Sequence, residues 1–491
     1  MTLTTLLISF GIIGILLTLV TKYLLGVKIN WIVTFMQFFC GVWYFFSGLV
    51  KAIDPMGTAF KMKEYFGEFS RHFDGSFLSF LSPLWPFLSE HVIWVSIFVI
   101  LLEILLGVAL IIGYRRLGTA WVFLLLLLFF IKLTGFTYLT GYVPSEAHFF
   151  DFSKWTAYKE SNMKVTDCGC FGDFLKLEPK VSFFKDIFLL LPALVFVFFW
   201  KSKHALYTSN WRRNVMLITG ILALGLCYYN TFMNEPIVDF RPFSEGTNIR
   251  EVKKAEEEAA AEVKVTGYKL VSKSDGKVVE MPMEQFMNEF KNYPAEQWEY
   301  EQIKTEPRIK HTKISDFRVE TDDGREISGE ILGEKGYSLM FVSYMLDGLE
   351  QTREVSVSDT TELVDSVLLA KNDPNAIQMR ITTATKNEVF YTWNSDFVKI
   401  VQEKINPLMD GIAAEGVKTL GIAGGAFTLK LDAFRKDNNV KFPIYMQDDL
   451  VVKTIMRSNP GLILWKDGVI VAKWHYKDFP SLEELKKMVK S

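Results

Sequence analysis

Two cysteines, Cys168 and Cys170, are separated by a single glycine in the segment Thr166–Asp173. A Cys-Gly-Cys sequence can close into a small disulfide ring, and strain in such a ring raises its reduction potential. A disulfide of this kind suits electron transfer better than structural stapling. Gly169 and Gly172 allow the tight turn that would let the two thiols meet. Cys168 and Cys170 are therefore the first candidates for catalytic residues.

The same pair could also have one of three roles without redox chemistry, and the spacing of the cysteines alone does not distinguish them. The cysteines could form a permanent structural disulfide, belong to an incomplete metal site, or be idle thiols. Two ligands do not make a zinc site, and the histidine nearest the loop is His148, so no metal site is predicted. Cys40 and Cys227 stand alone in apolar stretches and are expected to pack as small apolar residues.

A third candidate for chemistry is Glu103, which lies in the middle of an apolar run. An ionisable side chain there is costly unless it faces the protein interior and finds a partner. Counting the helical rise puts Lys132 at a similar depth, so we expect the two to pair. Glu103 then serves either a proton relay or an ion pair that fixes helix register. A transporter path would need more charges than these two, so we do not favour one.

The elements that position these residues follow from the distribution of apolar residues. The chain holds 54 Lys and Arg against 56 Asp and Glu, which gives no basic field for nucleic acid. Each apolar run is about 20 residues long, enough to cross a bilayer as a helix. We therefore predict a membrane-embedded all-α bundle of six transmembrane helices, at roughly 3–25, 31–50, 91–113, 117–140, 182–200 and 214–233.

Basic residues in the short loops predict the orientation of this bundle, because such loops stay in the cytoplasm. The first run has no basic residues before it, so it is expected to be a retained helix and not a cleaved signal peptide. The N-terminus, the cysteine loop and everything after residue 233 are then periplasmic, in a bacterial inner membrane. The loops with this bias contain Lys22 and Lys28, Arg115 and Arg116, and Lys201, Lys203, Arg212 and Arg213.

The second half of the chain is rich in charged residues and is expected to be soluble. Residues 1–233 form the membrane domain, 234–263 a stalk, 264–330 a small mixed α/β region, and 331–491 the last domain. In that domain the predicted order is strand, helix, strand, helix, two strands and helix, which is the order of a thioredoxin-like fold. An insertion at about 347–394 is expected either to contact a partner or to be surface decoration.

The last domain carries a second candidate site. Its segment Ser458–Gly468 is similar to the part of thioredoxins that holds a cis-proline, and Pro460 would then shape a peptide-binding edge. Ser343 and Tyr344 follow the first strand, where a thioredoxin carries its Cys-x-x-Cys motif. Since no thiol is present there, this domain is expected to bind proteins without redox chemistry.

Four stretches of the membrane half carry a resemblance to a known family: Ser47–Lys51, Asp54–Gly57, Glu103 with Gly107 and Gly113, and Cys168–Asp173. With them, roughly residues 30–230 resemble the DoxX and methylamine-utilisation MauE family. The resemblance implies a DoxX-like four-helix core and a role in periplasmic redox and disulfide maturation. It also implies similarity to quinone-linked vitamin K epoxide reductases, and so a membrane quinone as cofactor, which Glu103 as a proton relay would lie beside. Bacteroidetes relatives carry a similar periplasmic domain after the membrane part.

Two functions are consistent with these features. In the first, Cys168 and Cys170 exchange electrons with a periplasmic substrate, and the bundle passes them to a quinone. In the second, the chain is a non-catalytic subunit of an envelope complex, whose thioredoxin-like domain binds a periplasmic or membrane protein. Both place the chain in a lipid bilayer, and neither involves nucleic acid. Whether the chain is an enzyme depends on which of the two holds.

Overall fold

The computed structural model describes residues 2–165, 167–274, 276–321, 323–364 and 377–490. The chain divides into two compact units. The first contains residues 1–247 and 251–315, and the second contains residues 248–250 and 316–491.

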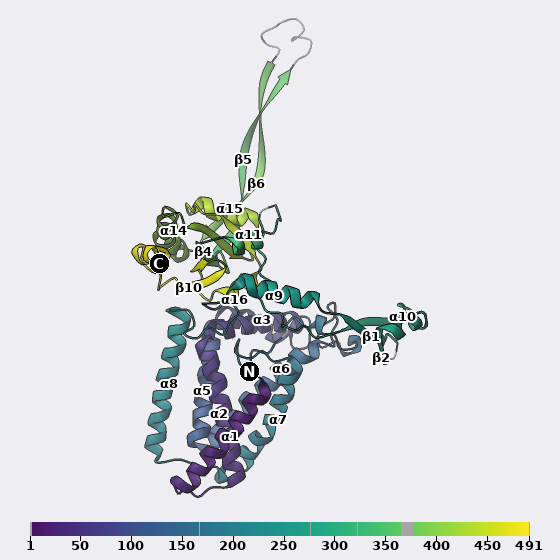
Figure 1. The fold of residues 1–491 in the computed structure, drawn as a ribbon, viewed down its shortest axis with the longest axis vertical. Coiled ribbons are helices and arrows are strands. Elements are labelled where there is room, and N and C mark those ends of the chain that lie inside the picture. The colour runs from purple at the N-terminus through teal and green to yellow at the C-terminus, as the bar shows by residue number, and fades with distance from the viewer. Residues whose placement is uncertain (1, 166, 275, 322, 365–376, 491) are drawn as a thin grey trace. The chain divides into compact units, whose positions relative to one another are not determined.

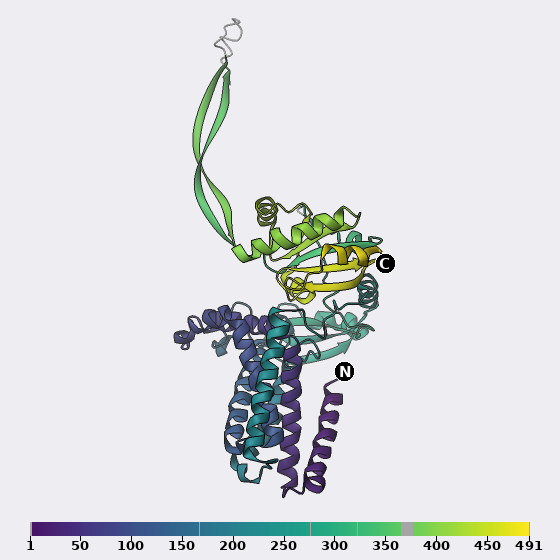
Figure 2. The ribbon, with the colours of Figure 1, turned by 90° about the vertical axis from the view of Figure 1, so that its left-hand side faces the viewer.

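Among the described residues, six helices are long and apolar enough to cross a membrane, which confirms the predicted number of spans. They run side by side in the first unit (Figures 1 and 2). The chain is thus a membrane protein by the length and composition of its helices. These are α1 with its π-helical continuation η1 (Leu3–Leu24), α2 (Trp31–Ile53), α5 (Val92–Ile112), α6 (Arg116–Thr140), α7 (Pro179–Phe198) and α8 (Ser209–Phe232).

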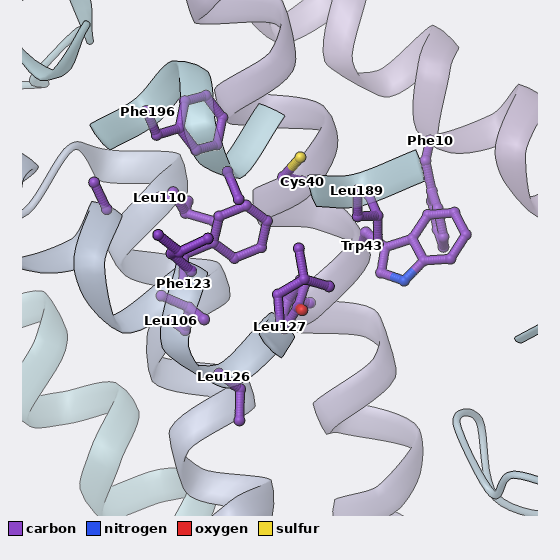
Figure 3. Close-up of a cluster of buried hydrophobic side chains, with 14 of the residues drawn as sticks. Phe10, Cys40, Trp43, Leu106, Leu110, Phe123, Leu126, Leu127, Leu189 and Phe196 are labelled. Atoms are coloured by element: carbon purple, nitrogen blue, oxygen red, sulfur yellow. The ribbon is translucent and has the colours of Figure 1, made fainter. Parts of the chain in front are cut away.

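The helices α2 and α5 approach each other closely because glycines line their contact. A Cβ atom on Gly107 would lie 2.4 Å from the backbone nitrogen of Phe45, and one on Gly48 would lie 2.9 Å from that of Ile104. Small residues let helix backbones meet in a membrane, where packing and hydrogen bonds hold helices together. Around this contact, apolar side chains from α1, α2, α5, α6 and α7 form the main core of the bundle (Figure 3).

Shorter elements connect the spans at the end of the bundle that holds the cysteine loop. The side chain of Asp54 caps α3 by accepting a 2.9 Å hydrogen bond from the backbone N–H of Gly57, and Pro55 occupies the first helical position. The connecting elements are α3 (Pro55–Phe73), η2 (Ser79–Leu81), α4 (Leu84–Glu90), η3 (Phe152–Lys154) and η4 (Glu160–Asn162), with η5 (Trp200–Ser202) at the opposite end.

The part of the chain after α8 begins with a charged helix and a small sheet. Glu256 of α9 accepts hydrogen bonds from the backbone N–H and hydroxyl of Thr312, at 3.0 and 2.7 Å. The antiparallel sheet has the order β2-β1-β3. The elements are α9 (Ile249–Ala261), β1 (Val265–Ser272), β2 (Val278–Pro282), α10 (Met283–Glu289), η6 (Phe290–Asn292) and β3 (Trp298–Lys304).

The second unit is built on a mixed five-stranded sheet with the order β10-β9-β4-β7-β8. The strands β4, β7 and β8 are parallel, whereas β9 and β10 are antiparallel to their neighbours. The predicted α/β domain is confirmed at this level. The strands are β4 (Tyr337–Ser343), β7 (Lys418–Gly424), β8 (Ile444–Gln447), β9 (Gly461–Lys466) and β10 (Val469–His475). The helices are α11 (Ser328–Gly333), α13 (Ser395–Ile400), η7 (Val401–Ile405), α14 (Asn406–Ala413), α15 (Thr428–Asp437), α16 (Asp449–Ile455) and α17 (Leu482–Lys490).

Two further segments belong to this unit. The insertion contains a long antiparallel hairpin of β5 (Gly348–Val364) and β6 (Ile377–Trp393), which forms a separate sheet and extends away from the five-stranded one (Figure 1). Within the small mixed region, the alternation of apolar and polar residues at Arg318–Thr321 predicts a short strand, but the structure has only isolated bridges of Glu320 there. Alternation over four residues was too short to distinguish a strand from a bridge.

Candidate functional site

The cysteine loop forms a tight turn that brings its two thiols to one place. Gly169 and Gly172 have φ angles of 58° and 52°, in the left-handed region that favours glycine. The N–H of Gly172 donates to the carbonyl of Gly169 at 3.2 Å. The predicted tight turn is confirmed. Both loop cysteines are free thiols, and Cys168 is buried while Cys170 is partly exposed.

Two contacts fix this loop against the helices. The ring of Phe171 is fully buried and lies 5.7 Å from that of Trp43 on α2, centroid to centroid. The sulfur of Cys170 donates to the buried hydroxyl of Ser182 in the first turn of α7, at 3.8 Å. Cys168 interacts with the same hydroxyl. A single serine therefore contacts both sulfurs and holds them at the end of α7.

Behind the loop lies a buried ion pair that touches its backbone. The Nζ of Lys51 is 2.6 Å from Oε1 of Glu103, and both side chains are almost fully buried. The hydroxyl of Ser47 lies 3.0 Å from Oε2 of Glu103 and 2.9 Å from the carbonyl oxygen of Cys170, so its one proton is shared between two acceptors. Since Ser47 and Lys51 are one turn apart on α2, both face Glu103 across the glycine contact. Glu103 is thereby linked to the cysteine loop.

The expected pairing of Glu103 with Lys132 is wrong. Lys132 is exposed on α6, and Lys51 takes its place. The count of charges within the spans was also too low, because α7 carries a second buried pair in which Nζ of Lys185 lies 2.5 Å from Oδ1 of Asp186. Depth along a helix can be counted from sequence, but the direction in which a side chain points from the bundle cannot.

The acidity of the loop thiols follows from their burial and from the charges beside them. Burial, followed by the neighbouring Cys170, raises the pKa of Cys168 to about 12. Burial also raises the pKa of Cys170, while the positive charge of Lys185 opposes this and the negative charge of Asp186 adds to it. Both thiols are therefore protonated at neutral pH. A reaction at Cys170 would depend on the cation of Lys185 to stabilise the thiolate.

Next to the loop, the first unit contains a large apolar cavity of about 1100 Å³. Its lining is dominated by aromatic rings, and several lining side chains on the spans, among them Phe98 and Phe129, are exposed on the outer surface of the bundle. The cavity is therefore open toward the region that lipid would occupy. Other lining residues are Phe66, Phe69, Trp85, Phe136 and Phe149.

Tyr65 of α3 connects this cavity with the cysteine loop. Its ring lines the cavity, and its buried hydroxyl has no hydrogen-bond partner by distance and angle among the described residues. The hydroxyl is near enough to Cys168 for each group to influence the other: burial and then the charge of Cys168 raise the pKa of Tyr65. A polar group of a ligand in the cavity could reach this hydroxyl, and one residue would then separate that ligand from a thiol.

The second predicted site contains no group that can transfer electrons. The Asn459–Pro460 peptide bond is cis, as the sequence led us to expect. The buried Ser343 hydroxyl lies 2.8 Å from Oδ1 of Asn459 and 3.0 Å from the carbonyl oxygen of Met345. The amide of Asn459 also donates to that carbonyl at 2.8 Å. Tyr344 lies beside them, half-buried. These contacts tie the end of β4 to the segment before β9.

Sequence reasoning missed several residues of the membrane site. Ser47 and Lys51 were noted only as part of a motif, although their spacing of one helical turn in an apolar helix was a usable signal. The other missed residues are Tyr65, Ser182, Lys185 and Asp186.

Neither protein-family models nor curated proteins nor solved structures give a match to this chain. The chemistry of the site is therefore inferred from the geometry of this chain alone.

Cys40 and Cys227 lie apart from this site. Cys40 is fully buried in the apolar core among Phe123, Leu189 and Phe196 (Figure 3). Cys227 is fully buried in a smaller apolar cluster with residues of α5 and α8. Among the described residues, no three His, Cys, Asp or Glu side chains come together as metal ligands.

Proposed function

We propose that this chain is a membrane thiol oxidoreductase in which Cys168 and Cys170 cycle between dithiol and disulfide. The observation that carries this proposal is the convergence of both sulfurs on the Ser182 hydroxyl, next to the charge pair of Lys185 and Asp186. A structural disulfide would need no cation beside it and no buried pair behind it. Idle thiols would need neither of these nor a turn with two left-handed glycines.

Thiol–disulfide exchange between a substrate dithiol and the loop takes two steps. A thiolate of a substrate dithiol attacks the Cys168–Cys170 disulfide at Cys170, and Cys168 leaves and takes up a proton. The second substrate thiolate then attacks the mixed disulfide at the substrate sulfur, and Cys170 leaves and takes up a proton. The substrate gains a disulfide, and the loop becomes the dithiol. Cys170 is assigned to the mixed disulfide because the positive charge of Lys185 stabilises its thiolate.

Glu103 acts on this chemistry through other residues. It holds Lys51 and Ser47, and the Ser47 hydroxyl reaches the backbone carbonyl of Cys170 and not its sulfur. We therefore assign Glu103 a positioning role. A path for protons from Cys170 to Glu103 would need a further carrier.

The aromatic cavity fits a membrane quinone as the electron acceptor. Its volume of about 1100 Å³ is at the upper end of that of small-molecule pockets, and its aromatic walls suit a flat ring with an apolar tail. A quinone supplies a two-electron, two-proton oxidation of the loop dithiol. Tyr65 would lie between a bound quinone and the loop, because its ring lines the cavity and its buried hydroxyl lies near Cys168 and Thr137.

The resemblance to DoxX and MauE proteins agrees with this assignment and suggests its location. We place the chain in a bacterial inner membrane, with the N-terminus, the cysteine loop and the C-terminal unit in the periplasm. The sheet order β10-β9-β4-β7-β8 and the cis-proline before β9 support a thioredoxin-like domain. Such a domain would bring a protein substrate to the membrane.

A second function is supported by the C-terminal unit. Where thioredoxins carry thiols, this chain has Ser343, whose hydroxyl lies 2.8 Å from Oδ1 of Asn459 beside the cis-proline. A chain that serves only to present this domain would be a non-catalytic subunit of an envelope complex. This function predicts that replacing both loop cysteines by serine leaves the cellular role intact.

Quinone reduction by the full chain in lipid nanodiscs separates the two functions. With a reduced protein dithiol as electron donor, we expect the absorbance of a short-chain quinone to fall only in the presence of the chain. The variant Cys170→Ser should be inactive, and Cys227→Ser should be fully active because Cys227 is remote from the loop. Equal rates with and without the chain would contradict the proposed oxidoreductase.

A further inference from the structure

At the end of the bundle opposite the cysteine loop, three loops enclose a polar pocket of about 490 Å³. Four cations line it: Lys28 before α2, Arg116 at the start of α6, and Lys201 and Lys203 between α7 and α8. Among the described residues that line this pocket, none is Asp or Glu. The sequence contains no Asp or Glu in the stretches 1–53, 104–145 and 187–234, which supply all of its walls. The positive charge of this pocket therefore has no carboxylate in these walls to balance it.

One of the four cations is held in place within the protein. The side chain of Lys203 is buried, and its Nζ donates to the carbonyl oxygen of Arg116 at 2.7 Å. Arg116 donates in return to the carbonyls of Lys203 and Lys201, at 2.8 and 3.2 Å. Burial and the neighbouring Arg116 lower the pKa of Lys203 to about 7. A buried ammonium without a carboxylate is costly, and an anion in the pocket would remove that cost.

We propose that this pocket binds a phosphate group, supplied by the headgroup of an anionic phospholipid. The side chain of Lys203 is buried and held by its hydrogen bond to the Arg116 carbonyl, and a bound anion would favour its charged form. Lys28 and Lys201 are exposed and can close over a ligand from two different loops. The pocket lies at the ends of spans, where phospholipid headgroups lie, and basic pockets between helices bind such headgroups. Bound lipid would then join the three loops and stabilise the bundle. This inference does not depend on the redox proposal.

Native mass spectrometry of the full chain tests this directly. The protein in detergent is mixed with equal amounts of phosphatidylglycerol and phosphatidylcholine that carry the same acyl chains. The detergent is then removed in the mass spectrometer, and the lipid that stays bound is identified. We expect retention of phosphatidylglycerol, weakened about fivefold for each cation removed. Lys203→Gln removes the buried charge. The double variant Lys28→Gln with Lys201→Gln removes two exposed charges and keeps the test valid if Lys203→Gln fails to fold.

The matched control is Arg115→Gln with Arg213→Gln, which changes the net charge equally at exposed positions outside the pocket. An equal loss of phosphatidylglycerol in control and pocket variants would show diffuse charge attraction and overturn the proposal. Equal retention of the two lipids, with no binding of inorganic phosphate, would also overturn it. If inorganic phosphate alone displaces phosphatidylglycerol, the phosphate site stands and a soluble ligand shares it.

Discussion

The two candidate sites of this chain each have what the other lacks. The membrane site has two thiols, buried ion pairs and an aromatic cavity within a helix bundle. The C-terminal site has a cis-proline beside the end of a buried parallel strand, but a serine and an asparagine where electrons would be exchanged. Reactive residues, and not the fold around them, decide where chemistry can occur.

This difference suggests a division of labour between the two units. The membrane unit would carry the electron transfer, and the C-terminal unit would carry recognition. Some variants that test this division remove a reactive or positioning group from one site. Others introduce a reactive group at the other site and test whether it restores activity.

The largest effect is expected from the loop cysteines. Cys170→Ser should lower oxidation of a dithiol substrate by more than about a hundredfold, because without Cys170 the loop cannot form the disulfide that the substrate thiolate attacks. Introducing a thiol at the other site, with Ser343→Cys, should not restore activity in that background. Dithiol oxidation by the purified chain measures both. Recovery through Ser343→Cys would break the division of labour.

The loop thiols should also differ from an ordinary cysteine in their pH dependence. Because the pKa of Cys168 is raised to about 12, its thiolate fraction in the folded protein is low at every pH below that value. Alkylation of the native chain at pH 7 should be about a thousandfold slower than in the unfolded chain, where the thiol pKa is about 8.5. The native rate should keep rising up to pH 10, and a plateau near pH 8.5 would contradict the burial of Cys168. Peptide mass spectrometry reports the alkylated residue.

The ion pair behind the loop should matter for stability as well as for activity. Glu103→Gln leaves Lys51 buried without its partner, and we expect a loss of about 3 to 5 kcal/mol in the free energy of unfolding. Glu103→Leu combined with Lys51→Met should recover most of that loss. Unfolding in mixed micelles measures both variants. If Glu103→Gln is as stable as the wild type, Lys51 and Glu103 do not form a buried ion pair in the membrane.

The close contact of α2 and α5 can be tested with one methyl group. Gly107→Ala places a Cβ within 2.4 Å of the Phe45 nitrogen, so the helices must separate, at a cost of about 1 to 3 kcal/mol. Gly225→Ala on α8 is the control, because a Cβ there meets nothing within 4 Å. Activity should fall in the first variant only, since the contact positions Glu103.

The smallest effect is expected at the C-terminal site. Ser343→Ala removes a hydroxyl that lies within hydrogen-bonding distance of Asn459 and Met345, and should lower the stability of that unit by about 1 kcal/mol. Dithiol oxidation by a small-molecule donor should not change. A large loss of that activity would place part of the chemistry in the C-terminal unit.

The sequence was sufficient for the spans, because hydrocarbon length is a property of the local sequence. It was also sufficient for the cysteine turn, because two glycines flank it at fixed spacing. The partner of Glu103 could not be found in this way, because Lys51 faces it only after α2 and α5 meet through Gly48 and Gly107. The hairpin β5–β6 was missed because its polar alternation does not indicate a buried face.

The redox state of the loop after contact with a quinone tests the central claim most directly. The chain is reduced, placed in lipid nanodiscs and mixed with a short-chain quinone, and the peptide that contains Cys168 and Cys170 is weighed after alkylation. If the loop passes electrons to a quinone, this peptide loses two hydrogens and escapes alkylation, while Cys40 and Cys227 remain thiols. If both loop cysteines remain thiols with quinone, yet a chemical oxidant joins them, the proposed electron transfer is contradicted.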